Sequence, residues 1–130
     1  MGEVGVDPGF RVLLVGVNDA TSIQLKAALG SRNFEVIGLS ADAAAYEALD
    51  RQAGTLKALV IDTELGAGAT GFDIARYARR LNAAVAVIFI THAHRDSIKM
   101  FGVPGAAHVG KPLDLDLLTM ILREFAKGYG

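Results

Sequence analysis

The chain of 130 residues contains no cysteine and no tryptophan. Without cysteine, disulfides, thiolate-ligated zinc and a cysteine nucleophile are all excluded. The chain also lacks an excess of charge of either sign, because 13 basic residues stand against 14 acidic ones and give a net charge of −1. This balance leaves no broad basic surface for DNA or RNA, so we expect no direct partnership with a nucleic acid.

Long hydrophobic runs are absent too. The longest apolar stretch covers the eight residues 83–90, whereas a membrane-spanning helix needs about 20. Residues 1–10 have neither the basic start nor the apolar segment of a secretion signal. With three glycines and one proline, they are expected to form a flexible leader. We therefore expect a cytoplasmic protein that does not contact a membrane.

Hydrophobic residues occupy 52% of all positions, which is sufficient for one packed domain, expected at residues 11–127. Short apolar runs predict strands buried on both faces of a sheet. These runs cover residues 11–17, 34–39, 56–61, 84–90 and 106–109. Helices are expected at about 19–29, from 40 or 42 to about 53, at 71–81, at 96–101 and after 114. Strands that alternate with helices in this way form a doubly wound α/β domain with a parallel sheet.

Polar side chains stand directly after four of the predicted strands. They are Asn18 and Asp19, then Asp62, Thr91 and Lys111. In an open α/β sheet the functional crevice lies at the carboxyl ends of the strands, so we expect these residues to share one site. An aspartate there is a nucleophile for phosphoryl transfer. A lysine and a hydroxyl supply the positive charge and the hydrogen bond that the phosphoryl oxygens need.

The chain resembles the receiver domain of two-component response regulators over about residues 11–127. The resemblance rests on LVIDTELGAGATGFDIAR around Asp62, VIFITHAH at the end of the fourth strand, and GAAHVGKPLDLDLL after it. It implies that Asp62 is the phosphoacceptor, Thr91 the switch hydroxyl and Lys111 the partner of the phosphoryl group, with a cis peptide bond to Pro112. We expect a five-stranded parallel sheet with five helices in the flavodoxin-like order 2-1-3-4-5.

The resemblance also implies a Mg²⁺ site, formed by Asp62, the backbone carbonyl of Glu64 and two adjacent acids that end the first strand. Counting back along the first helix places Gly16 and Val17 at these two positions. Counting back from the phosphoacceptor places Asn18 and Asp19 there instead. The acidic pair is incomplete in both registers.

Asp19 is the one carboxylate near these positions, and we take it as a metal ligand, with Asn18 as a weaker candidate. A hard dication prefers charged oxygen ligands, so we expect weak binding of Mg²⁺.

Two histidines occupy further positions that matter in receivers. His108 stands at the aromatic switch position of the fifth strand, where the resemblance implies a role in output. His92 replaces the small residue that follows the switch hydroxyl, and its imidazole narrows access to Asp62. The surface beside these positions, which includes Phe101 and Val103, often carries partner contacts in the family.

The sequence therefore favours a receiver that takes a phosphoryl group onto Asp62 from a histidine kinase or a phosphotransfer protein. It would then switch a face that binds an unidentified downstream protein or a second copy of the chain. Such a domain catalyses at most its own phosphorylation and dephosphorylation and is not a metabolic enzyme. The alternative is a degenerate receiver that binds partners without phosphorylation, which the incomplete acidic pair favours.

Two other motifs are weaker. Residues 66–71 spell GxGxxG, but the dinucleotide fingerprint needs its first glycine directly after a strand and an acid at the end of the next strand. Here the next strand ends in Thr91 and His92. The segment 91–97 is similar to the zinc motif of metallo-β-lactamases, but Ser97 stands where the closing histidine belongs. We therefore expect neither nucleotide binding nor zinc hydrolysis.

Overall fold

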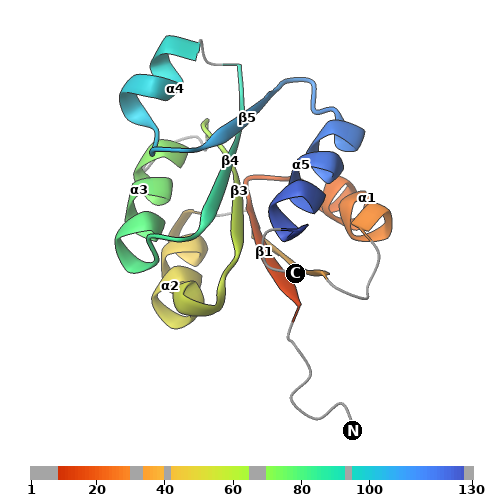
Figure 1. Cartoon of the computed structure of the whole chain (residues 1–130), viewed down its shortest axis with the longest axis horizontal. Coiled ribbons are helices and arrows are strands. Elements are labelled where there is room, and N and C mark those ends of the chain that lie inside the picture. Colours follow the sequence, from red (N-terminus) through yellow and green to blue (C-terminus); the bar gives the residue numbers. More distant parts are fainter. Residues whose placement is uncertain (1–8, 30–33, 40–41, 65–69, 93–94, 128–130) are drawn as a thin grey trace, which may run out of the picture.

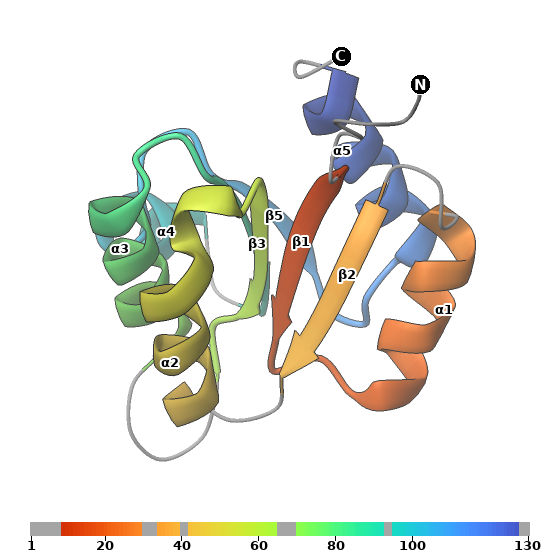
Figure 2. The ribbon, with the colours of Figure 1, turned by 90° about the horizontal axis from the view of Figure 1, so that it is seen from below.

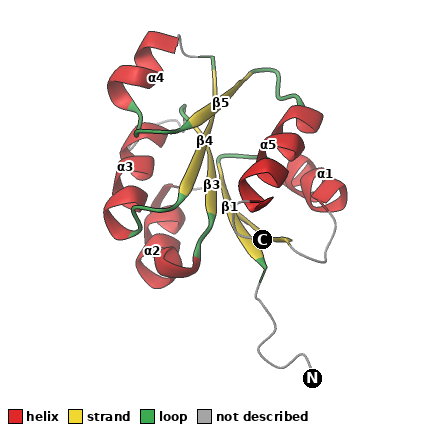
Figure 3. Cartoon of the chain, viewed as in Figure 1, coloured by secondary structure: helices red, strands yellow, loops and turns green. Residues whose placement is uncertain are grey.

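The computed structural model describes residues 9–29, 34–39, 42–64, 70–92 and 95–127. In these ranges the chain alternates between strands and helices (Figures 1 and 3). The strands are β1 (Phe10–Val15), β2 (Phe34–Leu39), β3 (Ala58–Asp62), β4 (Ala86–Thr91) and β5 (Ala107–Gly110). The helices are α1 (Asp19–Leu29), α2 (Asp42–Gln52), the 3₁₀ turn η1 (Ala53–Thr55), α3 (Gly71–Leu81), α4 (Arg95–Phe101) and α5 (Leu115–Lys127).

The strands form one parallel sheet in the order β2-β1-β3-β4-β5, which confirms the predicted doubly wound fold. Helices α1 and α5 cover one face of the sheet, and α2, α3 and α4 cover the other (Figure 2). The strand register aligns the carboxyl ends, because Asp62 pairs with Ile90 and Thr91 pairs with Gly110. The residues that follow β1, β3, β4 and β5 therefore meet at one edge.

The core lies in two layers, one on each face of the sheet. Successive strand residues point to opposite faces, so Leu59 packs in the layer under α2 and α3 while Val60 packs in the layer under α1 and α5. Both side chains are fully buried, as are their neighbours in β1 and β4. This two-sided burial explains why the central strands are continuous apolar runs rather than alternating ones.

The element bounds differ from the prediction at several strand ends. β1 stops at Val15 instead of residue 17, because Gly16 has a φ of 79°, a left-handed conformation that leaves the strand. At its other end β1 begins at Phe10, and residues 1–8 of the expected leader lie outside the described residues. β4 begins at Ala86 instead of 84, because Asn82 holds the preceding turn through the amides of Ala84 and Val85.

Within the described ranges, no helix has both the length and the apolar character needed to cross a membrane.

Candidate functional site

Asp62 and Lys111 form an ion pair at the carboxyl edge of the sheet. The Nζ atom of Lys111 lies 2.7 Å from Oδ2 and 2.9 Å from Oδ1 of Asp62. The two side chains are only 22% and 15% exposed, respectively. Desolvation by burial lowers the pKa of Lys111, but the hydrogen bond and the charge of Asp62, together with Glu64, outweigh it and hold the pKa above its usual value. Lys111 is therefore a fixed positive charge against Asp62.

The chain on either side of this pair also positions it. Asp62 is the last residue of β3, and Lys111 directly follows β5. The Lys111-Pro112 peptide bond is cis, as predicted. The amide of Glu64 donates a 2.8 Å hydrogen bond to Oδ1 of Asp62, which holds the carboxylate over the turn after β3. The Glu64 carboxylate lies 3.4 Å from the Lys111 ammonium, so two acids share one lysine.

Thr91, the expected switch hydroxyl, is buried and bonded to a second threonine. The hydroxyl of Thr63 donates a 2.8 Å hydrogen bond to Oγ1 of Thr91. The Thr63 amide also donates to the carbonyl of Ile90, which ties the turn after β3 to β4. Thr63 is not among the site residues predicted from the sequence. The sequence does contain a signal for it. Thr63 directly follows Asp62 at the end of a strand, and this places its hydroxyl at the same edge of the sheet as Thr91.

Helix α3 begins in direct contact with the backbone of the site. A Cβ atom on Gly71 would lie 2.3 Å from the carbonyl oxygen of Asp62, so only glycine fits there. A capping box caps the N-terminus of α3: the amide of Asp73 donates to the Thr70 hydroxyl, and the amide of Thr70 donates to the Asp73 carboxylate. The backbone hydrogen bond from Thr70 lowers the pKa of Asp73. These contacts fix where α3 starts relative to Asp62.

A small pocket of about 190 Å³ opens beside the ion pair. Its lining comes from the turns after β1 and β5 and from the ends of β3 and β4. The lining residues are Gly16, Val17, Asn18, Thr21, Asp62, Ile90, Lys111, Pro112 and Leu113. Among these described residues Asp62 supplies the one carboxylate. The pocket therefore gives access to both partners of the ion pair.

Several solved structures of response regulators and receiver domains are similar to this chain. A response regulator receiver protein from Sinorhizobium medicae is similar at a TM-score of 0.79, with 20% identity, over 95% of this chain and 98% of that one. The chain has the receiver fold. The receiver domain of the hybrid histidine kinase CckA is similar at 0.71, with 23% identity, over 89% and 98% of the chains. A response regulator from Thermotoga maritima is similar at 0.71, with 20% identity, over 92% and 98%.

No protein-family model and no curated protein matches the sequence. The similarity is therefore carried by the three-dimensional arrangement, and identities of this size establish the shared receiver fold.

The receiver fold allows the two registers of the acidic pair to be compared with the structure. Val15 pairs with Ile61, so Gly16 is the residue that comes level with Asp62, and both Gly16 and Val17 line its pocket. Asn18 also lines the pocket, but its Oδ1 accepts a 2.8 Å hydrogen bond from the amide of Thr21 and caps α1.

Asp19 is exposed in the first turn of α1 and does not belong to the pocket lining. The role of Asp19 as a metal ligand therefore stays a prediction.

The donor set around Asp62 does not fit a tightly held dication. Mg²⁺ binds in receivers through carboxylates, and a hard cation needs several charged oxygens. Gly16 and Val17 have no side-chain oxygen, and Lys111 already neutralises Asp62. In the described part of the chain, no group of three or more His, Cys, Asp or Glu residues is arranged to hold a metal ion. The backbone carbonyl of Glu64 as a ligand stays a prediction.

Both histidines singled out in the sequence are exposed. His92 follows β4 directly, and His108 lies in β5, where it pairs with Phe89. Phe101 ends α4 with half of its surface exposed, and its ring lies 6.1 Å from that of Phe72. His108 and Phe101 are therefore placed where a partner can reach them. His94 lies outside the described residues.

Proposed function

We propose that the chain is a receiver module of two-component signalling in which Asp62 accepts a phosphoryl group from a histidine kinase or a phosphotransfer protein. The observation that carries the proposal is the Lys111 ammonium, which lies within 2.9 Å of both carboxylate oxygens of Asp62. Thr91 lies at the adjacent strand end. This arrangement supplies a nucleophile, a fixed positive charge and a hydroxyl at one edge of the sheet.

In the proposed reaction, an Asp62 oxygen attacks the phosphorus of a phosphohistidine on the donor. The new P–O bond forms as the P–N bond breaks, and the imidazole leaves with the electron pair. Lys111 moves from the free carboxylate to the phosphoryl oxygens and offsets the charge that develops there. The contact between Lys111 and Glu64 breaks in this movement. At 3.4 Å it is longer than the 2.7 Å contact between Lys111 and Asp62.

Mg²⁺ supplies positive charge to phosphoryl oxygens in receivers when it is bound. The residues beside Asp62 do not offer the charged oxygens that hold it tightly, so we propose that Lys111 supplies most of this charge here. Phosphorylation of this chain should accordingly depend only weakly on Mg²⁺.

The switch proposed for the phosphorylated state starts at Thr91. When its hydroxyl turns toward the phosphoryl group, the hydrogen bond from Thr63 is broken and an existing equilibrium at the output face shifts. His108, Phe101 and Val103 stand on that face. Its partner is a downstream protein or a second copy of the chain.

The test is intact mass after incubation with a small-molecule phosphodonor, with and without Mg²⁺. The wild type should gain one phosphoryl group and Asp62→Asn none. Asp116→Asn, an exposed acid in the first turn of α5, is the matched control and should be modified like the wild type. A wild type that stays unmodified with both a small donor and a phosphorylated kinase would overturn the proposal.

A second candidate is a receiver that binds its partner without phosphorylation. The observation that favours it is that Lys111 is already paired with both Asp62 and Glu64, while Gly16 and Val17, which line the pocket beside Asp62, carry no side-chain oxygen. Under this reading, Asp62→Asn leaves partner binding unchanged, whereas under the first reading it abolishes the response to the kinase.

A further inference from the structure

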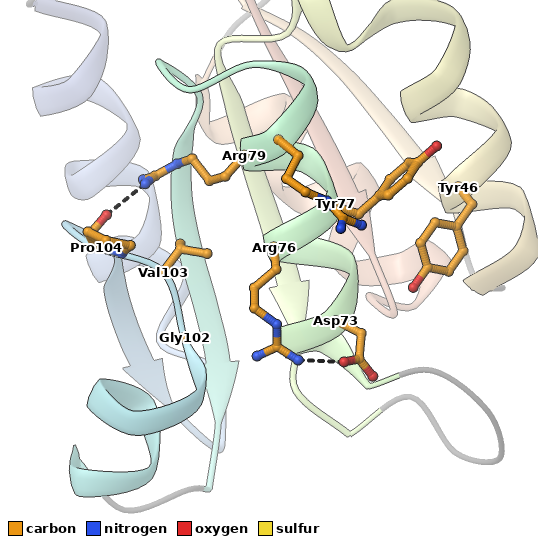
Figure 4. A pocket seen from close by; sticks show the side chains of 9 residues that line it. Tyr46, Asp73, Arg76, Tyr77, Arg79, Gly102, Val103 and Pro104 are labelled. Atoms are coloured by element: carbon orange, nitrogen blue, oxygen red, sulfur yellow. Dashed lines mark hydrogen bonds and ion pairs between the residues drawn. The ribbon is translucent and has the colours of Figure 1, made fainter.

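A larger pocket lies on α3, away from the Asp62 site. It measures about 670 Å³ and is bordered by α2, α3 and the turn between α4 and β5 (Figure 4). We refer to it as the α3 arginine pocket. Its lining residues are Tyr46, Asp73, Arg76, Tyr77, Arg79, Arg80, Gly102, Val103 and Pro104. None of these residues lines the pocket beside Asp62, so the two are separate sites.

The α3 arginine pocket carries an excess of positive charge. Three arginines line it against one aspartate, a balance of +3 and −1, although the whole chain has a net charge of −1. Arg76 forms an ion pair with Asp73, which accounts for the single acid. Among the described residues, neither Arg79 nor Arg80 forms an ion pair. The remaining charge of about two units is thus concentrated on one surface.

Arg79 is the central group of this surface. Its Nε donates to the carbonyl of Val85 at 2.7 Å. One terminal nitrogen donates to the carbonyl of Pro104, also at 2.7 Å (Figure 4). These carbonyls hold the guanidinium in place, but as neutral acceptors they do not cancel its charge. Desolvation by burial lowers the pKa of Arg79, because it disfavours the charged form of the guanidinium. An anion in the pocket would offset this cost.

The other side chains of the pocket are also held in place. The guanidinium of Arg80 lies 5.5 Å from the centre of the Tyr77 ring, at cation–π distance. The rings of Tyr77 and Tyr46 meet edge to face at 5.1 Å, and the Tyr77 hydroxyl donates to Asp50. Arg76 donates to the carbonyl of Phe101. A ligand would therefore lose little affinity to the ordering of long side chains.

The composition of the pocket is that of a protein-binding surface. Arginine and tyrosine are the residue types most enriched where interface energy concentrates. Val103 and Pro104 add apolar surface beside the charges, and the half-exposed Phe101 is linked to the pocket through the hydrogen bond from Arg76 to its carbonyl. We propose that the α3 arginine pocket docks an acidic segment of a partner protein, with carboxylates facing Arg79 and Arg80. This docking takes place in the unphosphorylated chain, although Val103 also belongs to the proposed output face.

The test uses a short oligoglutamate peptide as the probe and the unphosphorylated full chain. We expect saturable binding, measured by amide chemical shifts that change in α3 and residues 102–104, and an affinity that falls as salt rises. Arg80→Glu should weaken binding by about tenfold, equivalent to roughly 1.4 kcal/mol. Arg80→Lys, which keeps the charge but loses the planar group over Tyr77, should weaken binding less than Arg80→Glu does.

Arg123→Glu is the matched control. Arg123 is an exposed arginine on α5, on the opposite face of the sheet (Figure 2), and the same change of charge there should leave the affinity within about twofold. Three outcomes overturn the proposal: no saturable binding of oligoglutamate, equal weakening by Arg80→Glu and Arg123→Glu, or chemical shifts that change on the α1 and α5 face instead. The outcome of this binding test does not depend on whether Asp62 accepts a phosphoryl group, so the two proposals can fail separately.

Discussion

Replacing Lys111 with methionine tests how strongly the ion pair at the site contributes to the fold. Exposed ion pairs contribute about 0.2–1 kcal/mol, and removing one partner of a fully buried pair costs about 3–5 kcal/mol. The Lys111 and Asp62 side chains, at 22% and 15% exposed, lie between these limits. We expect Lys111→Met to lower the free energy of unfolding by about 2 kcal/mol, because it leaves the largely buried Asp62 carboxylate without a counter-charge.

A double-mutant cycle isolates the pair. Once Asp62→Asn has removed the charge, Lys111→Met should cost less than about 0.5 kcal/mol, which gives a coupling near 1.5 kcal/mol. Urea unfolding monitored by circular dichroism measures all four proteins. Lys127→Met is the control, since this lysine is 74% exposed in its pair with Glu124, and it should stay within about 0.5 kcal/mol of the wild type. Equal costs of Lys111→Met in both backgrounds would refute the ion pair as a stabilising contact.

The pH dependence of this pair has a definite sign. The pKa of Lys111 is raised above its ordinary 10.5. Lys111 therefore contributes fully to the free energy of unfolding at any pH below the pKa that it has in the unfolded chain. This contribution is lost as the pH rises through the pKa that Lys111 has in the folded chain. The difference in stability between wild type and Lys111→Met should stay constant through neutral pH and shrink only in alkali. A difference that disappears between pH 6 and 8 (roughly the range in which only histidines titrate) would contradict the assignment.

Three further predictions concern the contacts around the site. Thr70→Ala should lower the free energy of unfolding by about 1 kcal/mol, because the N-terminal cap of α3 is lost. In acid unfolding curves, the wild type should be more stable than Asp73→Asn, and this difference should fade as the pH falls through the lowered pKa of Asp73. Gly71→Ala should cost about 1–3 kcal/mol in urea, because its Cβ meets the carbonyl of Asp62; an unchanged midpoint would contradict this. Thr63→Val should cost about 1 kcal/mol and Thr63→Ser much less, because only valine removes the hydrogen bond to Thr91.

Much of the fold follows from the sequence because the central strands are buried on both faces. An apolar run such as residues 84–90 must be buried on both faces, and in a small domain only a central strand offers this. Because such runs alternate with predicted helices, a parallel sheet is the expected fold. The meeting of Asp62 and Lys111 was predictable for the same reason. Both residues directly follow strands, and the carboxyl ends of parallel strands share one edge.

The parts that the sequence did not predict depend on local backbone geometry and on packing between helices. The end of β1 is set by the positive φ of Gly16, and a glycine in a sequence does not reveal its φ. Asn18 was therefore considered as a metal ligand, although its side chain caps α1. The α3 arginine pocket requires the turn after α4 to lie against α3, and this contact joins residues about 25 positions apart, as Arg79 and Pro104 are.

The measurement that tests the central claim most directly is the location of the phosphoryl group. The chain is incubated with a phosphorylated histidine kinase, treated with borohydride and digested, and the peptide that spans β3 is sequenced by mass spectrometry. Borohydride reduces an aspartyl phosphate to homoserine, so the account predicts homoserine at position 62 and nowhere else. Unmodified aspartate at position 62, in a reaction where the same kinase labels a known receiver, would contradict it.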